Sequence, residues 1–337
     1  MNRFSIVRLP TLPATSARVA ERPAERVLRA GGIDLLDRMK EGLDAPDELV
    51  ELHAVGGDEG RALRGIETEG DGRLRVGALV TLAQLTEYED LPPALGALAE
   101  AAGHAATPGI RNAATVGGNL LQRPRCWYYR HADLVCLKKG GDMCFAQTGD
   151  HRYHAILGGG PSFIVHPSSL ASPLVALDAE VEIWKPGGGT RTLPIERLFV
   201  GPTVDPTREH DLQPGEILLA LRVPKPAKDQ RSAYATAKEK QSHDWPLAEA
   251  SVRLRQAGGV LRDVRVALGH VSPVPWRSKE AEAVLEGQAP SADLFERAAV
   301  AATEPARPLA GNAYKVPLAQ GLLRQALHHA TGIALPD

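Results

Sequence analysis

The sequence predicts an α+β protein of two domains, and three observations lead to this fold class. Residues 1–56 alternate short apolar strands with helical segments, the pattern of a small unit in which helices pack on a sheet. Residues 229–337 contain three strands of alternating polarity followed by three helical segments, as expected for a small antiparallel sheet covered on one face. The proline-rich stretch 224–228 separates the two patterns, and 337 residues are enough for two cores. We therefore predict domains at 1–224 and 229–337.

The first 56 residues are expected to fold as strand, helix, strand, helix and strand. A helix capped by Thr15 runs to Arg22, and a second helical segment ends near Lys40. The predicted strands are 4–7, 27–30 and 49–52.

Residues 57–224 continue this domain. Two alternating segments around Gly70-Asp71-Gly72 predict a β-hairpin, because glycine-containing turns are typical of hairpins. Thr81 begins a helix with the sequence of a capping box, and an alanine-rich helix is expected at 92–106. Further strands are expected at 163–165, 174–177, 180–184 and 216–224.

The C-terminal domain has the clearest periodicity in the chain. Its alternating segments predict strands at 233–235, 248–255 and 260–269. Apolar positions at helical spacing then predict helices at 278–285, 291–303 and 317–331.

Composition narrows the function. A net charge of −2 gives no broad basic surface, so nucleic acid is not an expected partner. No run of about 18 apolar residues predicts a membrane span. The N-terminus shows neither an apolar signal core nor a twin-arginine motif, so we expect no export signal in this chain.

Two glycine-containing segments are candidate phosphate-binding turns. The first, AGGIDLL, occupies 30–36 after a short strand, and the second, TVGGN, occupies 115–119. Adjacent glycines allow positive φ and let a ligand approach the main chain, whose N–H groups can bind an anion. The alternative interpretation of each segment is an ordinary tight turn without a ligand. Neither has the G-x-G-x-x-G pattern of a dinucleotide-binding Rossmann unit.

The three cysteines of the chain lie within 19 positions of one another. Cys126, Cys136 and Cys144 are separated by nine and seven residues. An odd number cannot form disulfides only, and the spacing lacks the C-x2-C pair of a zinc ribbon. Thiolates suit iron–sulfur clusters, which normally take four ligands. The residues alone leave two alternatives open: a cluster, or three cysteines without metal.

The glycine segments, together with HPSSLASPLVALDAEVEI at 166–183 and ALGHVSPVPWRSKEAEAVLEG at 267–287, resemble the FAD-binding subunit of the xanthine dehydrogenase family of molybdenum hydroxylases. The resemblance covers nearly the whole chain. The cysteine-bearing insert, 122–156, is similar to the branch of periplasmic aldehyde oxidoreductases and 4-hydroxybenzoyl-CoA reductases, whose flavin subunits also hold a [4Fe-4S] cluster.

This resemblance implies a fold. The first domain is expected to be an FAD-binding domain of the vanillyl-alcohol-oxidase (PCMH) type, with subdomains 1–56 and 57–224. The second is expected to be of the CO dehydrogenase flavoprotein C-terminal type.

The resemblance also implies a cofactor site for FAD between the two glycine segments. Two positions depart from the family, because Ser169 stands where the family has an acidic residue and Thr236 where it has a lysine. The candidate FAD-binding residues are Ala30, Gly31, Gly32, Ile33, Asp34, Leu35, Leu36, Thr107, Thr115, Gly117, Gly118, Asn119 and Ser169.

The predicted [4Fe-4S] cluster needs a fourth ligand besides Cys126, Cys136 and Cys144. In the 4-hydroxybenzoyl-CoA reductase branch a fourth cysteine stands where this chain has His154, and imidazole is a competent iron ligand. We therefore predict His154. The other candidates are His131, Asp133, Asp142, Asp150, His151 and solvent.

The resemblance implies an electron-transfer subunit of a molybdenum-dependent aldehyde- or xanthine-type oxidoreductase. Electrons would arrive from the [2Fe-2S] clusters of a partner subunit, themselves supplied by a molybdenum-cofactor subunit, and would leave for an external acceptor. No catalytic acid or base is predicted. The alternatives are a stand-alone flavin oxidoreductase of the same fold and a scaffold that has lost its flavin. The expected location is the cytoplasm, or the periplasm by co-export with a signal-bearing partner.

Overall fold

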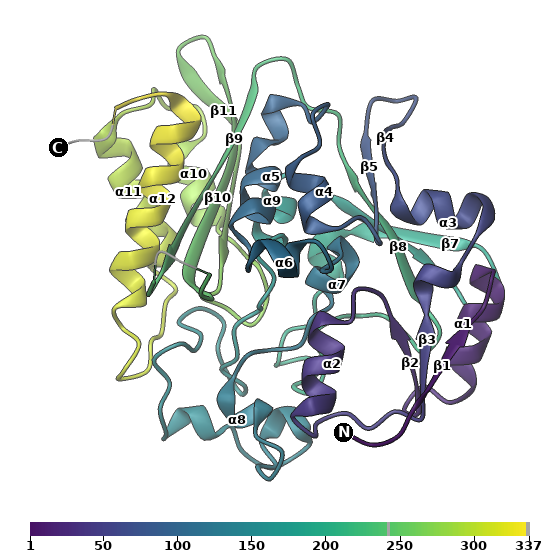
Figure 1. Cartoon of the computed structure of the whole chain (residues 1–337). Helices are drawn as coiled ribbons and strands as arrows, with labels where there is room; N and C mark the ends of the chain where they lie inside the picture. The colour runs from purple at the N-terminus through teal and green to yellow at the C-terminus, as the bar shows by residue number, and fades with distance from the viewer. Residues whose placement is uncertain (241–242, 335–337) are drawn as a thin grey trace.

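The computed structural model describes residues 1–240 and 243–334. Three sheets with helices packed against them make up the chain, so the predicted α+β class is confirmed (Figure 1). Residues 335–337, the end of the predicted second domain, lie outside the described residues. None of the described helices is long and apolar enough to cross a membrane.

The N-terminal sheet is parallel, with strand order β1-β3-β2. Its elements are β1 (Ser5–Arg8), α1 (Leu12–Glu21), β2 (Arg26–Arg29), α2 (Ile33–Lys40), β3 (Glu48–Glu51) and a 3₁₀ turn at Leu52–Ala54. The first helix begins earlier than predicted, because Thr11 and not Thr15 caps it. Thr15 lies inside the helix, and its hydroxyl donates to the Thr11 carbonyl at 2.8 Å.

The second sheet is antiparallel, with order β4-β5-β8-β6-β7. Its strands are β4 (Ile66–Thr68), β5 (Leu74–Gly77), β6 (Glu180–Trp184), β7 (Thr190–Pro194) and β8 (Ile217–Val223). The helices around it are α3 (Gly57–Arg64), α4 (Leu82–Thr86), α5 (Gly96–His104), α6 (Pro108–Arg111), α7 (Val116–Leu120) and α9 (Ala171–Ala176), with 3₁₀ turns at Pro93–Leu95 and Ile195–Arg197. The predicted capping box at Thr81 is confirmed.

Two predicted strands of this region are wrong. The segment 163–165 has no strand structure, and 174–177 lies largely within the helix α9. All six residues of α9 are buried, and Ser172 is its only polar residue, so the helix shows no alternation of apolar and polar faces. The periodicity of apolar residues cannot distinguish such a helix from a buried strand, so the apolar run 174–177 was predicted as a strand.

The third sheet is antiparallel, with order β12-β11-β10-β9. Its strands are β9 (Gln230–Lys238), β10 (Pro246–Ala257), β11 (Val260–Gly269) and β12 (Trp276–Arg277). The helices α10 (Lys279–Leu285), α11 (Ala292–Thr303) and α12 (Lys315–Thr331) cover one face, while α5 and α9 lie on the other (Figure 1). The three predicted C-terminal helices are thus confirmed.

The insert 122–156 folds with little regular structure. It contains α8 (Trp127–Arg130) and two 3₁₀ turns, Leu137–Lys139 and Phe145–Gln147. It lies beside α2 at the end of the molecule away from α3 (Figure 1). Ion pairs from Arg125 and Arg130 to Asp34 of α2 connect the insert to the N-terminal sheet.

Candidate functional site

The two glycine segments are in direct contact. Gly32 has φ +76° and precedes the first turn of α2, a conformation that favours glycine. A Cβ on Gly31 would lie 2.0 Å from the carbonyl oxygen of Ala113, so only glycine lets the two segments approach this closely. The N-terminal sheet and the second sheet therefore meet at this pair of turns.

The second segment was expected to be a turn but folds as the start of a short helix. Gly117 and Gly118 belong to the short helix α7, which Thr115 caps by accepting a hydrogen bond from the Gly118 amide at 3.1 Å. Neither Gly117 nor Gly118 adopts the positive φ that glycine allows. Glycine is needed at 117 for a different reason, because a Cβ there would lie 3.0 Å from the Cβ of Ala78.

A cavity of about 800 Å³, hereafter the central cavity, opens between these segments. Its size is in the range of ligand-binding cavities. The predicted FAD-binding residues that line it are Ala30, Gly31, Gly32, Ile33, Asp34, Leu35, Thr107, Thr115, Gly117, Gly118, Asn119 and Ser169. Leu36 does not line it and packs instead against the small core of the N-terminal sheet. The structure thus brings together twelve of the thirteen predicted residues.

Asp34 has partners that the sequence did not reveal. Its carboxylate accepts from Arg130 at 2.6 Å, pairs with Arg125 at 2.9 Å and with Arg38, and accepts from the Arg123 amide at 3.0 Å. Burial raises its pKa, but these cations and hydrogen bonds outweigh burial and lower the pKa overall. Asp34 is therefore ionised at neutral pH and holds the cysteine insert against the first glycine segment.

The far wall of the central cavity comes from other parts of the chain. Asn119 accepts from the Ser168 hydroxyl at 2.6 Å, which fixes α7 against the segment before α9. Lys238 at the end of β9 also lines the cavity, and its Nζ donates to the His104 carbonyl at 2.6 Å. Thr236 carries a buried hydroxyl without a hydrogen-bond partner. The sequence pattern did not identify Lys238 as a residue of this site.

The cysteines lie on the inner side of the insert. Cys136 and Cys144 are buried, Cys126 is partly buried, and all three are free. The Nε2 atom of His154 lies 3.2 Å from the Cys126 sulfur, and the Nδ1 atom is buried without a partner. Burial raises the pKa of Cys126 to about 12, which amide hydrogen bonds from Tyr129 and Tyr128 only partly oppose. Burial, followed by the charge of Lys315, lowers the pKa of His154 to about 4, so its imidazole is neutral.

The other candidate fourth ligands are differently placed. The His151 ring is engaged on both sides, with Nδ1 2.9 Å from the Ala146 carbonyl and Nε2 accepting from the Gly311 amide at 2.7 Å. Asp150 is paired with Arg152. The remaining three side chains are exposed: His131, Asp133 and Asp142.

Across residues 1–240 and 243–334, no group of three or more histidine, cysteine, aspartate or glutamate side chains is arranged to hold a single metal ion. One ion needs all its donors within about 2.3 Å of one centre. A four-iron cluster distributes its ligands over four iron atoms and needs a wider arrangement. The [4Fe-4S] cluster therefore stays a prediction.

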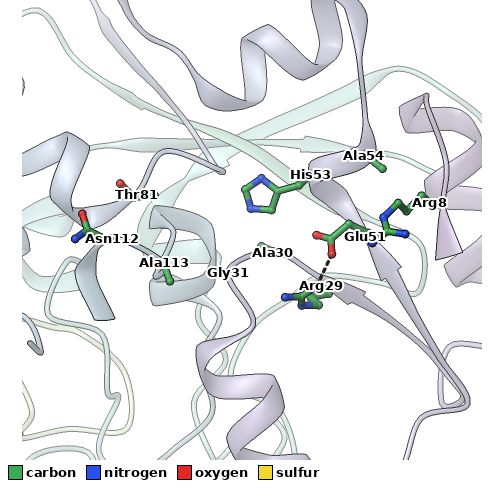
Figure 2. Close-up of a pocket in the computed structure, with 10 residues that line it drawn as sticks. All are labelled: Arg8, Arg29, Ala30, Gly31, Glu51, His53, Ala54, Thr81, Asn112 and Ala113. Atoms are coloured by element: carbon green, nitrogen blue, oxygen red, sulfur yellow. Dashed lines mark hydrogen bonds and ion pairs between the residues drawn. The ribbon is translucent and has the colours of Figure 1, made fainter. Parts of the chain in front are cut away.

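Two smaller cavities adjoin the central one. The first, of about 260 Å³, is hereafter the aromatic pocket; Cys126, Trp127, Tyr153 and His154 line it, and it shares Arg125, Pro167, Asp244, Trp245 and Pro246 with the central cavity. The second, of about 510 Å³, lies at the first glycine segment (Figure 2). Figure 2 shows its Arg29 joined to Glu51, at 2.5 Å, so the charge of that arginine is balanced.

Comparison with known proteins matches this geometry to a family. The family described as "FAD binding domain in molybdopterin dehydrogenase" matches residues 3–226, and the CO dehydrogenase flavoprotein C-terminal domain matches 232–330. The chain is 34% identical to the aldehyde oxidoreductase FAD-binding subunit PaoB of Escherichia coli (strain K12), covering 98% of this chain and 99% of that protein. It is 28% identical to the carbon monoxide dehydrogenase medium chain of Hydrogenophaga pseudoflava, over 90% of this chain and 88% of that one.

A solved structure shows the same fold. In carbon monoxide dehydrogenase from Hydrogenophaga pseudoflava, in a form that lacks the Mo-pyranopterin moiety, one chain superposes with a TM-score of 0.75 at 28% identity, covering 98% of both chains. The predicted combination of an FAD-binding domain with a CO dehydrogenase flavoprotein C-terminal domain is therefore confirmed. The chain belongs to the family of FAD-binding subunits of molybdenum hydroxylases, the xanthine dehydrogenase family, and is an oxidoreductase subunit.

Proposed function

We propose that this chain binds FAD in the central cavity and a [4Fe-4S] cluster in the insert, and that it passes electrons from a partner subunit to an external acceptor. The observation that carries the proposal is the central cavity itself, because both glycine segments line it and Arg125 and Trp245 join it to the pocket at Cys126. Two redox groups in these positions would be neighbours.

The chain's own residues suit a flavin nucleotide. The N-terminus of α2, at Gly32 and Ile33, lies at the wall of the cavity. Free amide groups at a helix N-terminus favour the negative charge of a diphosphate. Apolar side chains such as Ile33 and Leu35 offer contacts to rings. Bound FAD supplies the redox chemistry, while the protein supplies position and electrostatics.

Four side chains of the insert suit an iron–sulfur cluster. Cys126, Cys136 and Cys144 are the only cysteines of the chain. Cys144 and Cys136 lie close enough to Cys126 for their charges to raise its pKa. A thiol whose pKa is about 12 stays protonated unless a metal displaces the proton. His154, already 3.2 Å from that sulfur and neutral, is the fourth ligand in this proposal.

The proposed partners are a [2Fe-2S] subunit and a molybdenum-cofactor subunit. Relatives are named as a FAD-binding subunit and as a medium chain, which are parts of larger enzymes. The assembly would operate in the cytoplasm, or in the periplasm after co-export with a partner that carries the signal.

The decisive experiment is purification of the native assembly with its flavin counted. We expect one FAD per chain, loss of FAD in Gly32→Val, and retention in Gly109→Val, whose added side chain meets open space. The Gly32 substitution acts because β-branched residues rarely adopt φ +76°. A Gly32→Val protein with full flavin absorbance would show that the site is misplaced. A lone chain that oxidises aldehydes with an artificial dye would instead favour the stand-alone oxidoreductase.

The cluster is tested separately, by counting iron in anaerobically purified variants. We expect four irons in the unmodified chain and a three-iron paramagnetic signal, or complete loss, in His154→Ala. His154→Cys should restore four irons at a lower potential, since thiolate adds negative charge. His151→Ala is the matched control and should keep its iron. Unchanged iron, spectrum and potential in both His154 variants would rule out ligation.

A further inference from the structure

Glu249 is a carboxylic acid in the middle of the third sheet with no exposed surface. It lies on β10, opposite Thr236 of β9 and Gly269 of β11. A Cβ on Gly269 would lie 2.5 Å from the Glu249 Oε2 atom, so the absence of a side chain there makes room for the carboxyl group. The strands thus form a specific cradle for this acid.

The partners of this carboxyl group are neutral. Tyr234 donates its hydroxyl to Oε1, and Ser172 donates its own to Oε2 at 3.4 Å. The Nε2 atom of His270 lies 3.5 Å away, and burial keeps the pKa of that histidine well below its usual value. Among the described residues, no lysine or arginine forms an ion pair with Glu249. A buried carboxylate without a cation is costly, and such groups respond by holding a proton.

Glu249 lies directly behind the wall of the central cavity. Lys238 and His104 both line that cavity. Lys238 stands two residues after Thr236, the β9 partner of Glu249, and the His104 ring lies 6.2 Å from the ring of Tyr234, which donates to Glu249. Burial raises the pKa of Glu249 to about 7, even though Tyr234, Ser169, Ser172 and Lys238 oppose the rise. The group is therefore able to exchange a proton near neutral pH.

We propose that Glu249 takes up one proton when the flavin in the central cavity is reduced. The inference rests on the proposed function, since it requires FAD in that cavity. In the balanced step the flavin would gain two electrons from the partner's centres and one proton. The Glu249 carboxylate would gain one further proton and become a neutral carboxylic acid. Both protons come from solvent, and no bond other than the new O–H and N–H bonds forms.

The physical reason is charge. Reduction adds negative charge to the central cavity, and the buried Glu249 carboxylate behind its wall is repelled by that charge. Binding a proton removes that repulsion, and by linkage the protonated acid raises the potential of the flavin. Glu249 thus acts on the flavin potential through its charge and does not need to touch the flavin ring.

Other titratable groups surround this carboxyl group and set its response. From β9 come Tyr234 and Lys238. Burial raises the pKa of Tyr234 and lowers the pKa of Lys238. After β11 comes His270, which in turn faces Lys315 of α12 and His166. Lys315 donates to the His270 carbonyl at 2.9 Å, and burial lowers its pKa to about 7. Because Lys315 can also titrate near neutrality, a variant at Glu249 itself is required to identify the group.

The test is the flavin midpoint potential of the native assembly between pH 6 and 9. Above about pH 7, we expect the midpoint potential of the unmodified protein to fall more steeply with pH than that of Glu249→Gln. The difference in slope should be about 30 mV per pH unit, the value for one additional proton in a two-electron couple. Glu216→Gln is the matched control. Its carboxylate also lines the cavity but is paired with Arg191 at 2.7 Å, so its loss should move the potential equally at every pH. Equal slopes in the unmodified protein and Glu249→Gln would overturn the proposal.

A second variant and a second measurement separate this role from a structural one. Tyr234→Phe removes a hydrogen bond that lowers the pKa of Glu249, so the pH at which the slope steepens should move upward. Infrared difference spectra of the unmodified protein at pH 8 should gain a protonated-carboxyl band on flavin reduction, shifted in D₂O. Absence of that band contradicts proton uptake even if the variants fail to fold. An assembly without flavin contradicts the proposed function instead.

Discussion

Neighbouring glycines of the first segment have different physical roles. Gly32 has positive φ, which a side chain would strain, whereas Gly31 lies against the main chain of Ala113. The second role concerns the distance between the first glycine segment and the residues just before the second one. Motif-based reasoning assigns both glycines to the cofactor, but only the structure shows that Gly31 sets the separation of the cavity walls.

Gly31→Ala should therefore weaken both folding and flavin binding. The added Cβ at 2.0 Å from the Ala113 oxygen forces the two segments apart, which costs about 1–3 kcal/mol as overpacking does. Urea denaturation and flavin content measure the two effects. Gly109→Ala in α6 is the control, because nothing lies within 4 Å of its Cβ, and it should keep flavin and lose no stability. Equal stability of both variants would contradict the role given to Gly31.

How far the sequence predicts single residues depends on the distance of their partners along the chain. The glycine segments were identified because their signal is local. The partners of Asp34 could not be predicted, since Arg125 and Arg130 lie more than 90 positions away in the sequence and reach it only through the folded insert. Glu249 gave no local signal either, because its cradle comes from three strands and a helix.

At the level of elements, the insert is held by buried charge more than by a core. The Lys138 ammonium lies 2.7 Å from Glu209, whose other oxygen lies 2.7 Å from Arg123. Lys138 also donates to the carbonyls of Pro206 and Arg208. Burial lowers the pKa of Lys138, while Glu209 opposes the effect. The pair thus ties the cysteine segment to the loop before β8.

Lys138→Met should release this part of the insert. Removing the only partner of a buried charge costs about 3–5 kcal/mol. Glu209 keeps its ion pair with Arg123, so we expect a smaller loss of stability in Lys138→Met. We expect loss of iron and a lower denaturation midpoint. The double variant Lys138→Met/Glu209→Leu should recover part of the stability, because no buried carboxylate is left; the Arg123 side chain loses its partner but is partly exposed to solvent. Lys139→Met is the control, since Lys139 donates only to exposed carbonyls. A double variant as unstable as the single one would argue against a charge effect.

Elements with a one-sided pattern were predicted well, and those buried on all sides were not. The strand β11 and the helices α10 and α11 alternate or repeat in polarity, and their predicted ends are correct to within one residue. The helix α9 lacks any polar face and was taken for a strand. The domain boundaries at 224 and 229 stay a prediction.

At the scale of the whole molecule, the third sheet closes the flavin-binding part of the chain. Tyr234 and Ala267 of this sheet belong to the same apolar core as the second sheet and α9. Asp178, just after α9, is paired with Arg253 at 2.8 Å and Arg265 at 3.2 Å. The central cavity therefore has walls from all three sheets, and a buried acid of the third sheet can influence a ligand held by the first.

Protonation of Glu249 should also affect how the free energy of unfolding depends on pH. Folding raises the pKa of Glu249 from 4.5 to about 7, so between these values the unfolded chain has lost its proton while the folded chain retains it. Stability from this group is fully present below about pH 4.5 and is lost as the pH rises through 7, a loss of at most about 3 kcal/mol. Glutamine cannot ionise, so Glu249→Gln should gain stability relative to the unmodified chain as the pH increases from 5 to 8.

Urea denaturation of the full chain at several pH values measures this difference. Lys315 titrates in both proteins and cancels from the comparison. Glu216→Gln provides a control of opposite sign: burial raises the pKa of Glu216, but Arg191 and the Gln213 amide outweigh it and lower the pKa. That variant should therefore lose stability relative to the unmodified chain as the pH rises through the acid range. A difference between Glu249→Gln and the unmodified chain that stays constant from pH 5 to 8 would mean that Glu249 is not protonated in the folded state. In that case the proposed proton uptake on flavin reduction would have to start from a permanently ionised carboxylate.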